Sequence, residues 1–299
     1  MTVSQQSRVE FDAEVTFRNG GSLSVRGFRL DSPTPELTDA EVADLLVRHL
    51  GLLMVGAVTV ANRRMITEAH KGSRGVETER PPGRLVDLSH PIHHGMVTYP
   101  GLPAPEISDH LSRETSPSVY GPGTEFQIGR ISMVANTGTY LDSPFHRYAG
   151  GTDLAGLPLE RLADLDALVV RVAGDGLRAV DKAALLPFDV TGRAVLVHTG
   201  WDANWGTEAY FSGHPYLTAD AAEWLVGQGA ALVGIDSLNI DGTDGTDRPV
   251  HTALLAAGIP IVEHLRGLAE LPADGFRFHA VPAPVVGFGT FPVRAYAVL

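Results

Sequence analysis

The sequence predicts an α/β fold for the larger part of this 299-residue chain. Short apolar runs of strand length alternate with segments whose apolar residues recur at helical spacing, which is typical of α/β proteins. The 33 glycines and 20 prolines fall among these runs and indicate many turns rather than a helical bundle. With 44% hydrophobic residues, the chain can bury a substantial core in one large domain or two smaller ones.

The N-terminal region combines a hairpin pattern with a helix pattern. Residues 9–30 alternate apolar and polar side chains around Asn19-Gly20-Gly21, which predicts two antiparallel strands. Thr38 and Glu41 have capping-box spacing, so we expect a helix to begin there. The apolar residues that follow at helical spacing are Val42, Leu45, Leu46, Leu50 and Leu53.

The composition changes after an apolar run at residues 55–61. Residues 71–83 are rich in glycine, proline and charged side chains, which predicts a linker. We therefore expect an N-terminal strand-helix module over residues 1–75 and a second domain over residues 84–299. The sequence does not indicate what the N-terminal module does.

A long polar segment comes early in the second domain. Residues 102–129 are rich in proline, serine and glycine, and an irregular stretch of this length usually forms a lid or a binding loop. Tyr99 and Phe126 are candidates to line a substrate pocket there. The alternative is that these aromatic side chains pin the loop to the core.

Strand and helix patterns alternate through the rest of the domain. Mostly apolar runs predict buried strands at residues 167–172, 194–197, 230–235 and 259–262, and a last strand at 293–298. Helical patterns predict helices at residues 180–186, after Thr218, and at 250–257. This order of elements supports the α/β prediction.

The stretch from Ala135 to His146 places a carboxylate and an imidazole in a tight turn after a strand-like run. Asp142 and His146 are four residues apart, and Pro144 between them prevents a regular helix. A fixed turn therefore aims both side chains, which suits a metal site or a proton-transfer pair. The alternative is that Asp142 caps the Ser-Pro turn and His146 is a packed, partly buried histidine.

A second pair of candidate residues follows nearer the C-terminus. His251 lies at the start of a predicted helix, and Glu263 lies at the end of a predicted strand. A carboxylate after four mostly apolar strand residues is costly to bury unless it is paired or binds a ligand. Glu263 therefore either takes part in a site or forms an ion pair, for which Arg266 is a candidate partner.

Two loops near these residues are polar or glycine-rich. The acidic loop contains Asp236, Asn239, Asp241, Asp244 and Asp247. Because it lacks the frame of a calcium-binding EF-hand, we expect a turn beside the pocket, with Asp236 or Asp241 shaping its mouth. Residues 287–290 lack the features of a nucleotide loop, so we expect their backbone to approach substrate, with Phe288 as a contact.

The stretch ending at His146 resembles the signature of the cyclase family that includes bacterial kynurenine formamidase and isatin hydrolase, His-x-Gly-Thr-His-x-Asp-x-Pro-x-His. The matching residues are Gly138, Thr139, Asp142, Pro144 and His146. Asn136 and Tyr140 replace the first two histidines, so the resemblance is to a divergent member. It extends from Leu85 essentially to the C-terminus and includes Trp201 in a matched Thr-Gly-Trp, a candidate substrate contact.

This resemblance implies a β-barrel-like core of mixed sheet with helices outside it, and a homo-oligomer, either a dimer or a tetramer. It also implies a metal site, because the family places metal ligands at matching positions. The implied ligands are Asp142, His146, His251 and Glu263. No second metal is expected, since the carbonyl of Asn136 is neutral and the phenol of Tyr140 must first lose a proton.

Three functions remain open. In the first, one zinc or manganese ion activates water for hydrolysis, or the reverse ring closure, at an amide, ester or lactone carbonyl of a small substrate, aromatic compounds included. In the second, no metal binds, and His146 with Glu263 or Asp142 is the general base for a cyclisation or dehydration. Tyr140 then donates a proton and Asn136 holds a carbonyl or oxyanion. In the third, the chain binds a small molecule without catalysis.

Composition excludes several other classes. The net charge of −12 argues against a nucleic acid or an anionic membrane as partner. With no cysteine, the chain has no disulfide, thiolate ligand or cysteine nucleophile, so any metal must use His, Asp or Glu. The N-terminus lacks a secretory pattern, and the most apolar window, residues 50–61, is too short to span a bilayer. We expect a cytoplasmic protein that acts on a small molecule.

Overall fold

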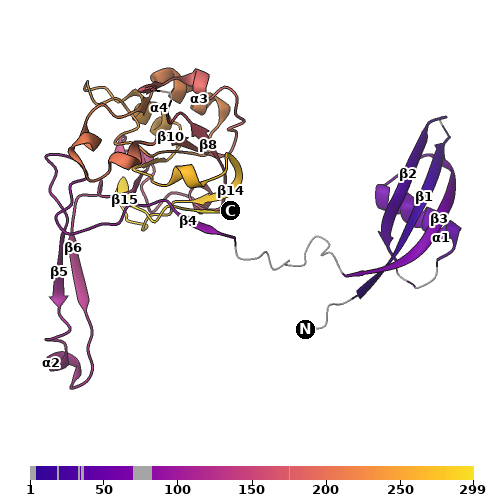
Figure 1. The fold of residues 1–299 in the computed structure, drawn as a ribbon, viewed down its shortest axis with the longest axis horizontal. Helices are drawn as coiled ribbons and strands as arrows, with labels where there is room; N and C mark the ends of the chain where they lie inside the picture. The colour runs from indigo at the N-terminus through magenta and orange to yellow at the C-terminus, as the bar shows by residue number, and fades with distance from the viewer. Residues whose placement is uncertain (1–4, 19, 33, 35–36, 70–82, 175) are drawn as a thin grey trace. The chain divides into compact units, whose positions relative to one another are not determined.

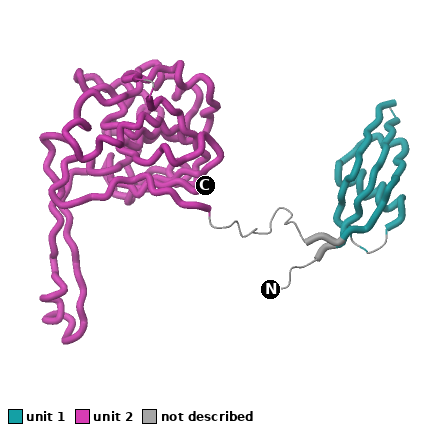
Figure 2. The backbone as a smooth tube through the Cα atoms, in the orientation of Figure 1, with its two compact units in different colours: residues 1–82 teal, residues 83–299 magenta. Residues whose placement is uncertain are grey.

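The computed structural model describes residues 5–18, 20–32, 34, 37–69, 83–174 and 176–299. The chain forms two compact units, residues 1–82 and 83–299, which Figure 2 shows in separate colours. The predicted linker lies outside the described residues except for Gly83, and so does Asn19 of the predicted hairpin turn. In the described part of the chain, no helix has the length and apolar character needed to cross a membrane.

The first unit is a three-stranded antiparallel sheet with one helix (Figure 1). Its elements are β1 (Gln5–Phe17), β2 (Ser22–Asp31), α1 (Asp39–Leu50) and β3 (Val55–Ala69), with strand order β2-β1-β3. The predicted hairpin and the capping box of Thr38 and Glu41 are confirmed. Gly51 ends α1 in the left-handed conformation, so the prediction that Leu53 continues the helix is wrong, and Leu53 is 82% exposed.

The second unit is built on a nine-stranded mixed sheet that curls into a half-barrel (Figure 1). Its order is β15-β7-β13-β12-β10-β8-β14-β16-β4. The strands are β4 (Leu85–Asp87), β7 (Tyr140–Asp142), β8 (Leu165–Arg171), β10 (Ala194–His198), β12 (Leu232–Ile235), β13 (Ile261–Glu263), β14 (Asp274–His279), β15 (Thr290–Pro292) and β16 (Tyr296–Val298). The four neighbouring strands β13, β12, β10 and β8 run parallel, and the pairings flanking them are antiparallel.

The central strands are apolar throughout because both faces of the sheet are covered. On β10, Ala194 and Leu196 pack into one core while Val195 and Val197 pack into the other. Helices α3 (Ala219–Gln228) and α4 (Pro249–Ala256) lie over one face, where they enclose the second core (Figure 1). The predicted α/β fold with a barrel-like mixed sheet and outer helices is therefore confirmed.

Two predicted elements differ from the structure. The irregular segment expected at residues 102–129 instead contains an antiparallel hairpin, β5 (Glu106–Leu111) with β6 (Ile128–Ser132), and α2 (Pro117–Tyr120). This hairpin forms an arm that extends from the body of the unit (Figure 1). The helix expected at residues 180–186 is a single 3₁₀ turn at Lys182–Ala184 after β9 (Ala179–Val180), which pairs with β11 (Tyr216–Leu217).

Candidate functional site

Asp142 and His146 lie where β7 leads into the 3₁₀ turn Pro144–His146. Asp142 is fully buried, because β7 pairs with β13 on one side and β15 on the other. The Thr290 hydroxyl of β15 donates to Asp142 Oδ1 and lies 2.7 Å from His146 Nδ1. A hydroxyl has one proton, so Nδ1 of His146 is the donor in the second bond. Nε2 is therefore the ring nitrogen of His146 that is left to bind a ligand.

Asp241 orients His251 at the start of α4. Its carboxylate accepts hydrogen bonds from the backbone amides of Val250 and His251 and from His251 Nδ1, which lies 2.7 Å away. Nε2 of His251 then faces Asp142 Oδ2 and Glu263 Oε1, each 3.6 Å away. Burial lowers the pKa of His251, but the carboxylates of Asp142 and Asp241 and the charge of Glu263 outweigh burial and raise that pKa to about 10.

Glu263 is buried and hydrogen-bonded through both carboxylate oxygens. The Tyr140 hydroxyl donates to Oε2 at 2.5 Å, and the Ile240 amide donates to Oε1 at 2.6 Å. Burial, together with the charge of Asp142, raises the pKa of Glu263 to about 7, although His251 opposes this. Burial and the charge of Glu263 hold the pKa of Tyr140 well above its ordinary value, so its phenol keeps its proton.

Tyr99 and Asn239 extend this hydrogen-bond network. The Tyr99 hydroxyl donates to the Leu238 carbonyl at 2.5 Å and lies 3.0 Å from the Tyr140 hydroxyl. The Asn239 side-chain amide donates to Tyr99 at 3.1 Å. The Tyr140 hydroxyl thus bonds with Glu263 and Tyr99, and among the described residues no hydrogen bond joins it to Asp142 or His146.

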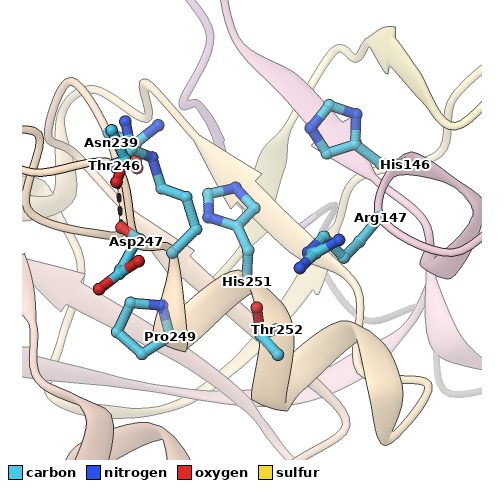
Figure 3. Close-up of a pocket in the computed structure, with 9 residues that line it drawn as sticks. His146, Arg147, Asn239, Thr246, Asp247, Pro249, His251 and Thr252 are labelled. Carbon is cyan, nitrogen blue, oxygen red and sulfur yellow. Dashed lines mark hydrogen bonds between the residues drawn. The ribbon is translucent and has the colours of Figure 1, made fainter.

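These side chains line two cavities that share His146, Asn239 and His251. The inner chamber, about 170 Å³, is lined by Tyr99, Leu102, Asn136, Tyr140, His146, Asn239, His251 and Glu263. The outer pocket, about 560 Å³, is lined by His146, Arg147, Asn239, Thr246, Asp247, Arg248, Pro249, His251 and Thr252 (Figure 3). Because the two cavities share these three residues, a small molecule in the larger outer pocket can present one group to the smaller inner chamber.

Asp142, His146 and His251 fit a single metal ion. Each supplies a ligand atom, and these atoms lie within 4.8 Å of one another. Asp142 Oδ2 is buried and has no hydrogen-bond partner among the described residues, as expected of an atom reserved for a ligand. Two imidazoles and a carboxylate suit zinc or manganese, and the hydrogen bond from His251 to Asp241 is of the kind that orients metal-binding histidines. Glu263 lies beside this group of three side chains but outside it.

The predicted substrate contacts are distributed over different parts of the unit. Tyr99 lines the inner chamber, but Trp201, Phe126 and Phe288 line neither cavity. Asn136, which was predicted to hold a carbonyl or oxyanion, also lines the inner chamber. Trp201 donates from Nε1 to the Tyr210 carbonyl at 3.0 Å, which ties two loops together. Phe126 lies on the arm, 54% exposed, with its ring against Tyr120.

Several residues of the site did not emerge from the sequence. Thr290 belongs to the glycine-rich segment expected near substrate, but its hydroxyl joins Asp142 to His146. Asp241 was expected at the mouth of the pocket and instead holds His251. Arg147 and Arg248 carried no signal beyond being close in sequence to His146 and His251.

The second unit matches proteins of known family. The family model described as Putative cyclase matches residues 86–242. A kynurenine formamidase of Bacillus cereus is 28% identical over 212 residues, which are 70% of this chain and 95% of that protein.

Solved structures of the same fold also match. A potential metal-dependent hydrolase with cyclase activity has a TM-score of 0.59 at 26% identity, covering 72% of this chain and 96% of that one. An isatin hydrolase bound to the product analogue thioisatinate has a TM-score of 0.64 at 20% identity, covering 73% and 93%, and this likeness concerns the fold. The family model alone spans more than half of the chain, and so the chain belongs to the cyclase family.

Proposed function

We propose that residues 83–299 form a hydrolase that cleaves a C–N bond at the carbonyl of a small amide, using one divalent metal ion. The observation that carries this proposal is the unpartnered, buried Asp142 Oδ2, which lies 3.6 Å from Nε2 of His251, a residue that lines both cavities. The kynurenine formamidase relative supports an amide as the substrate class. Three protein ligands leave a coordination position for water, as in catalytic rather than structural sites.

The surrounding side chains supply the other parts of an amide hydrolysis. A zinc or manganese ion at Asp142, His146 and His251 would acidify water and polarise the substrate carbonyl. Glu263 is suited to accept the proton of the attacking water and return it to the leaving nitrogen, because its pKa of about 7 permits both steps near neutrality. Tyr140 holds Glu263 in place by donating to Oε2. The Asn136 side chain, which lines the chamber, can donate to the carbonyl oxygen.

A metal-independent cyclisation or dehydration is the second candidate. The pKa of His251, raised to about 10, favours a doubly protonated ring. The imidazolium would then supply the positive charge between the carboxylates of Asp142 and Glu263. In that case the ring could not bind metal through Nε2, and the imidazolium would act as the acid of the site. The two candidates therefore predict opposite responses to metal removal.

The test is turnover by protein stripped with a chelator and then reloaded with zinc or manganese. The probes are formanilide and a set of small lactams. We expect activity to disappear on stripping and to return with one equivalent of metal. Amide turnover that survives stripping would contradict the role of the metal, and no turnover by either form would contradict amide hydrolysis.

Tyr140→Phe provides a second arm of this test. Losing the hydrogen bond to Glu263 should lower the rate by about tenfold to a hundredfold, the range typical of a group that positions a general base. The metal content of this variant should equal that of the wild-type protein, because Tyr140 makes no contact with the three ligands in the hydrogen-bond network. A loss of metal in this variant would instead place the phenol in the metal site.

A further inference from the structure

Two arginines lie in the outer pocket without an acidic partner among the described residues. Arg147 directly follows His146 and reaches towards His251 and Thr252 (Figure 3). The contact that its guanidinium makes with described residues is with the Tyr148 ring, 5.5 Å away. The Tyr148 hydroxyl in turn donates to the Thr252 carbonyl of α4 at 2.9 Å. This bond holds the Tyr148 ring, against which Arg147 packs, at the helix.

Arg248 precedes α4 and is held by backbone carbonyls. Its Nη1 donates to the carbonyls of Gly245 at 2.9 Å and Asp247 at 2.8 Å, and more weakly to that of Gly242 at 3.4 Å. No described carboxylate lies within ion-pair distance of it. One nitrogen therefore anchors the guanidinium, and its remaining N–H groups stay available for a ligand.

These two arginines differ from Arg178, Arg277 and Arg294 of the same unit, which pair with aspartates. Their positive charges line the cavity beside His146 and His251 in a chain whose net charge is −12. In the outer pocket, Asp247 is the lining carboxylate, and among the described residues it forms no ion pair with either arginine. A concave wall with two available guanidinium groups is an anion-binding surface, because the planar fork matches a carboxylate in geometry and charge.

We infer that the substrate carries a carboxylate, which Arg147 and Arg248 bind in the outer pocket while its amide carbonyl enters the inner chamber. This inference rests on the proposed amide hydrolysis at the same site, since the two cavities share His146, Asn239 and His251. Arg147 and Arg248 are then specificity-determining residues. They select an acidic amide over a neutral one of the same size.

The experiment compares hydrolysis of 2-, 3- and 4-formamidobenzoate with hydrolysis of the three matching formamidobenzamides by the metal-loaded enzyme. The acid should be preferred in kcat/KM by tenfold or more for at least one isomer, as expected for charge-assisted hydrogen bonds. Arg147→Gln and Arg248→Gln should each reduce this preference by about tenfold. Asp247→Asn, which removes the negative lining charge, should increase it.

Arg277→Gln is the matched control, because it removes the same charge from an exposed ion pair with Asp164. It should leave the preference at the wild-type value. A ratio near one for all three isomers would overturn the inference, and so would a preference that persists in both pocket variants.

Binding measurements separate this inference from the proposed hydrolysis. Calorimetric titration with the three aminobenzoates and their aminobenzamides requires no turnover. Tighter binding of an acid, lost in the Arg147 and Arg248 variants, would support the carboxylate site even if no amide were cleaved. Equal binding of acids and amides would overturn the carboxylate site while leaving the hydrolysis proposal standing.

Discussion

At the scale of single residues, the position of His146 depends on a glycine from the other end of the second unit. A Cβ atom on Gly289 would lie 2.5 Å from His146 Cα and 2.9 Å from the carbonyl carbon of Phe145. The Ser143 amide also donates to the Gly289 carbonyl at 2.7 Å. Backbone atoms cannot move aside as the end of a flexible side chain can, so only glycine fits there.

Gly289→Ala should therefore displace His146 from Thr290 and from the proposed metal. We expect a loss of about 1–3 kcal/mol in unfolding free energy, as in other overpacked sites, and at least a tenfold drop in kcat/KM. Thermal unfolding and the formanilide assay measure the two effects. Gly150→Ala is the control, since a Cβ atom there would meet nothing within 4 Å. Similar behaviour of the two variants would refute this account of Gly289.

At the scale of elements, α4 gains both its N-terminal cap and the orientation of His251 from Asp241. Asp241→Asn places an amide where one oxygen now accepts from His251 Nδ1, so we expect the metal dissociation constant to rise tenfold to a hundredfold. Competition with a chromophoric chelator measures this constant. Asp244→Asn, which changes an exposed carboxylate of the same loop, should bind metal as the wild type does. Equal affinities in the two variants would remove the orienting role from Asp241.

The elements that sequence predicted well are those buried on both faces. Strands β8, β10 and β12 appear as mostly apolar runs because their buried apolar side chains pack into one of two cores. The arm of β5 and β6 was missed because its strand residues are mostly exposed and carry no alternation towards a core. The helix expected at residues 180–186 failed because Asp181 caps only a 3₁₀ turn, and Pro187 disfavours helical backbone at Leu186.

The sequence predicted only those residues of the candidate site that are proposed to bind metal or to transfer protons. Local patterns and the family signature pointed to Asp142, His146, His251 and Glu263. The last three line the two cavities, and Asp142 lies 3.6 Å from His251. The role of Thr290 could not be predicted because it depends on the pairing of β15 with β7, about 150 residues earlier in the chain. Sequence patterns do not specify such non-local pairing.

At the scale of the whole second unit, the site lies at one end of the nine-stranded sheet. The order β15-β7-β13 brings together Thr290, Asp142 and Glu263, and α4 adds His251 from the adjoining face. Asp142, Asp241 and Glu263 place three buried carboxylates around one imidazole ring. Such a concentration of buried negative charge needs a positive partner, and in the proposed hydrolase that partner is a divalent metal ion.

The central claim is that this partner is one metal ion, and metal content measures it most directly. Elemental analysis after loading with zinc or manganese and removal of unbound metal should find one ion per chain in the wild type. The exposed-histidine control His93→Gln should also hold one, whereas Asp142→Asn and His251→Gln should hold none while keeping the wild-type circular dichroism spectrum. A wild-type protein without metal, or an Asp142→Asn variant that retains a full equivalent, would contradict the account.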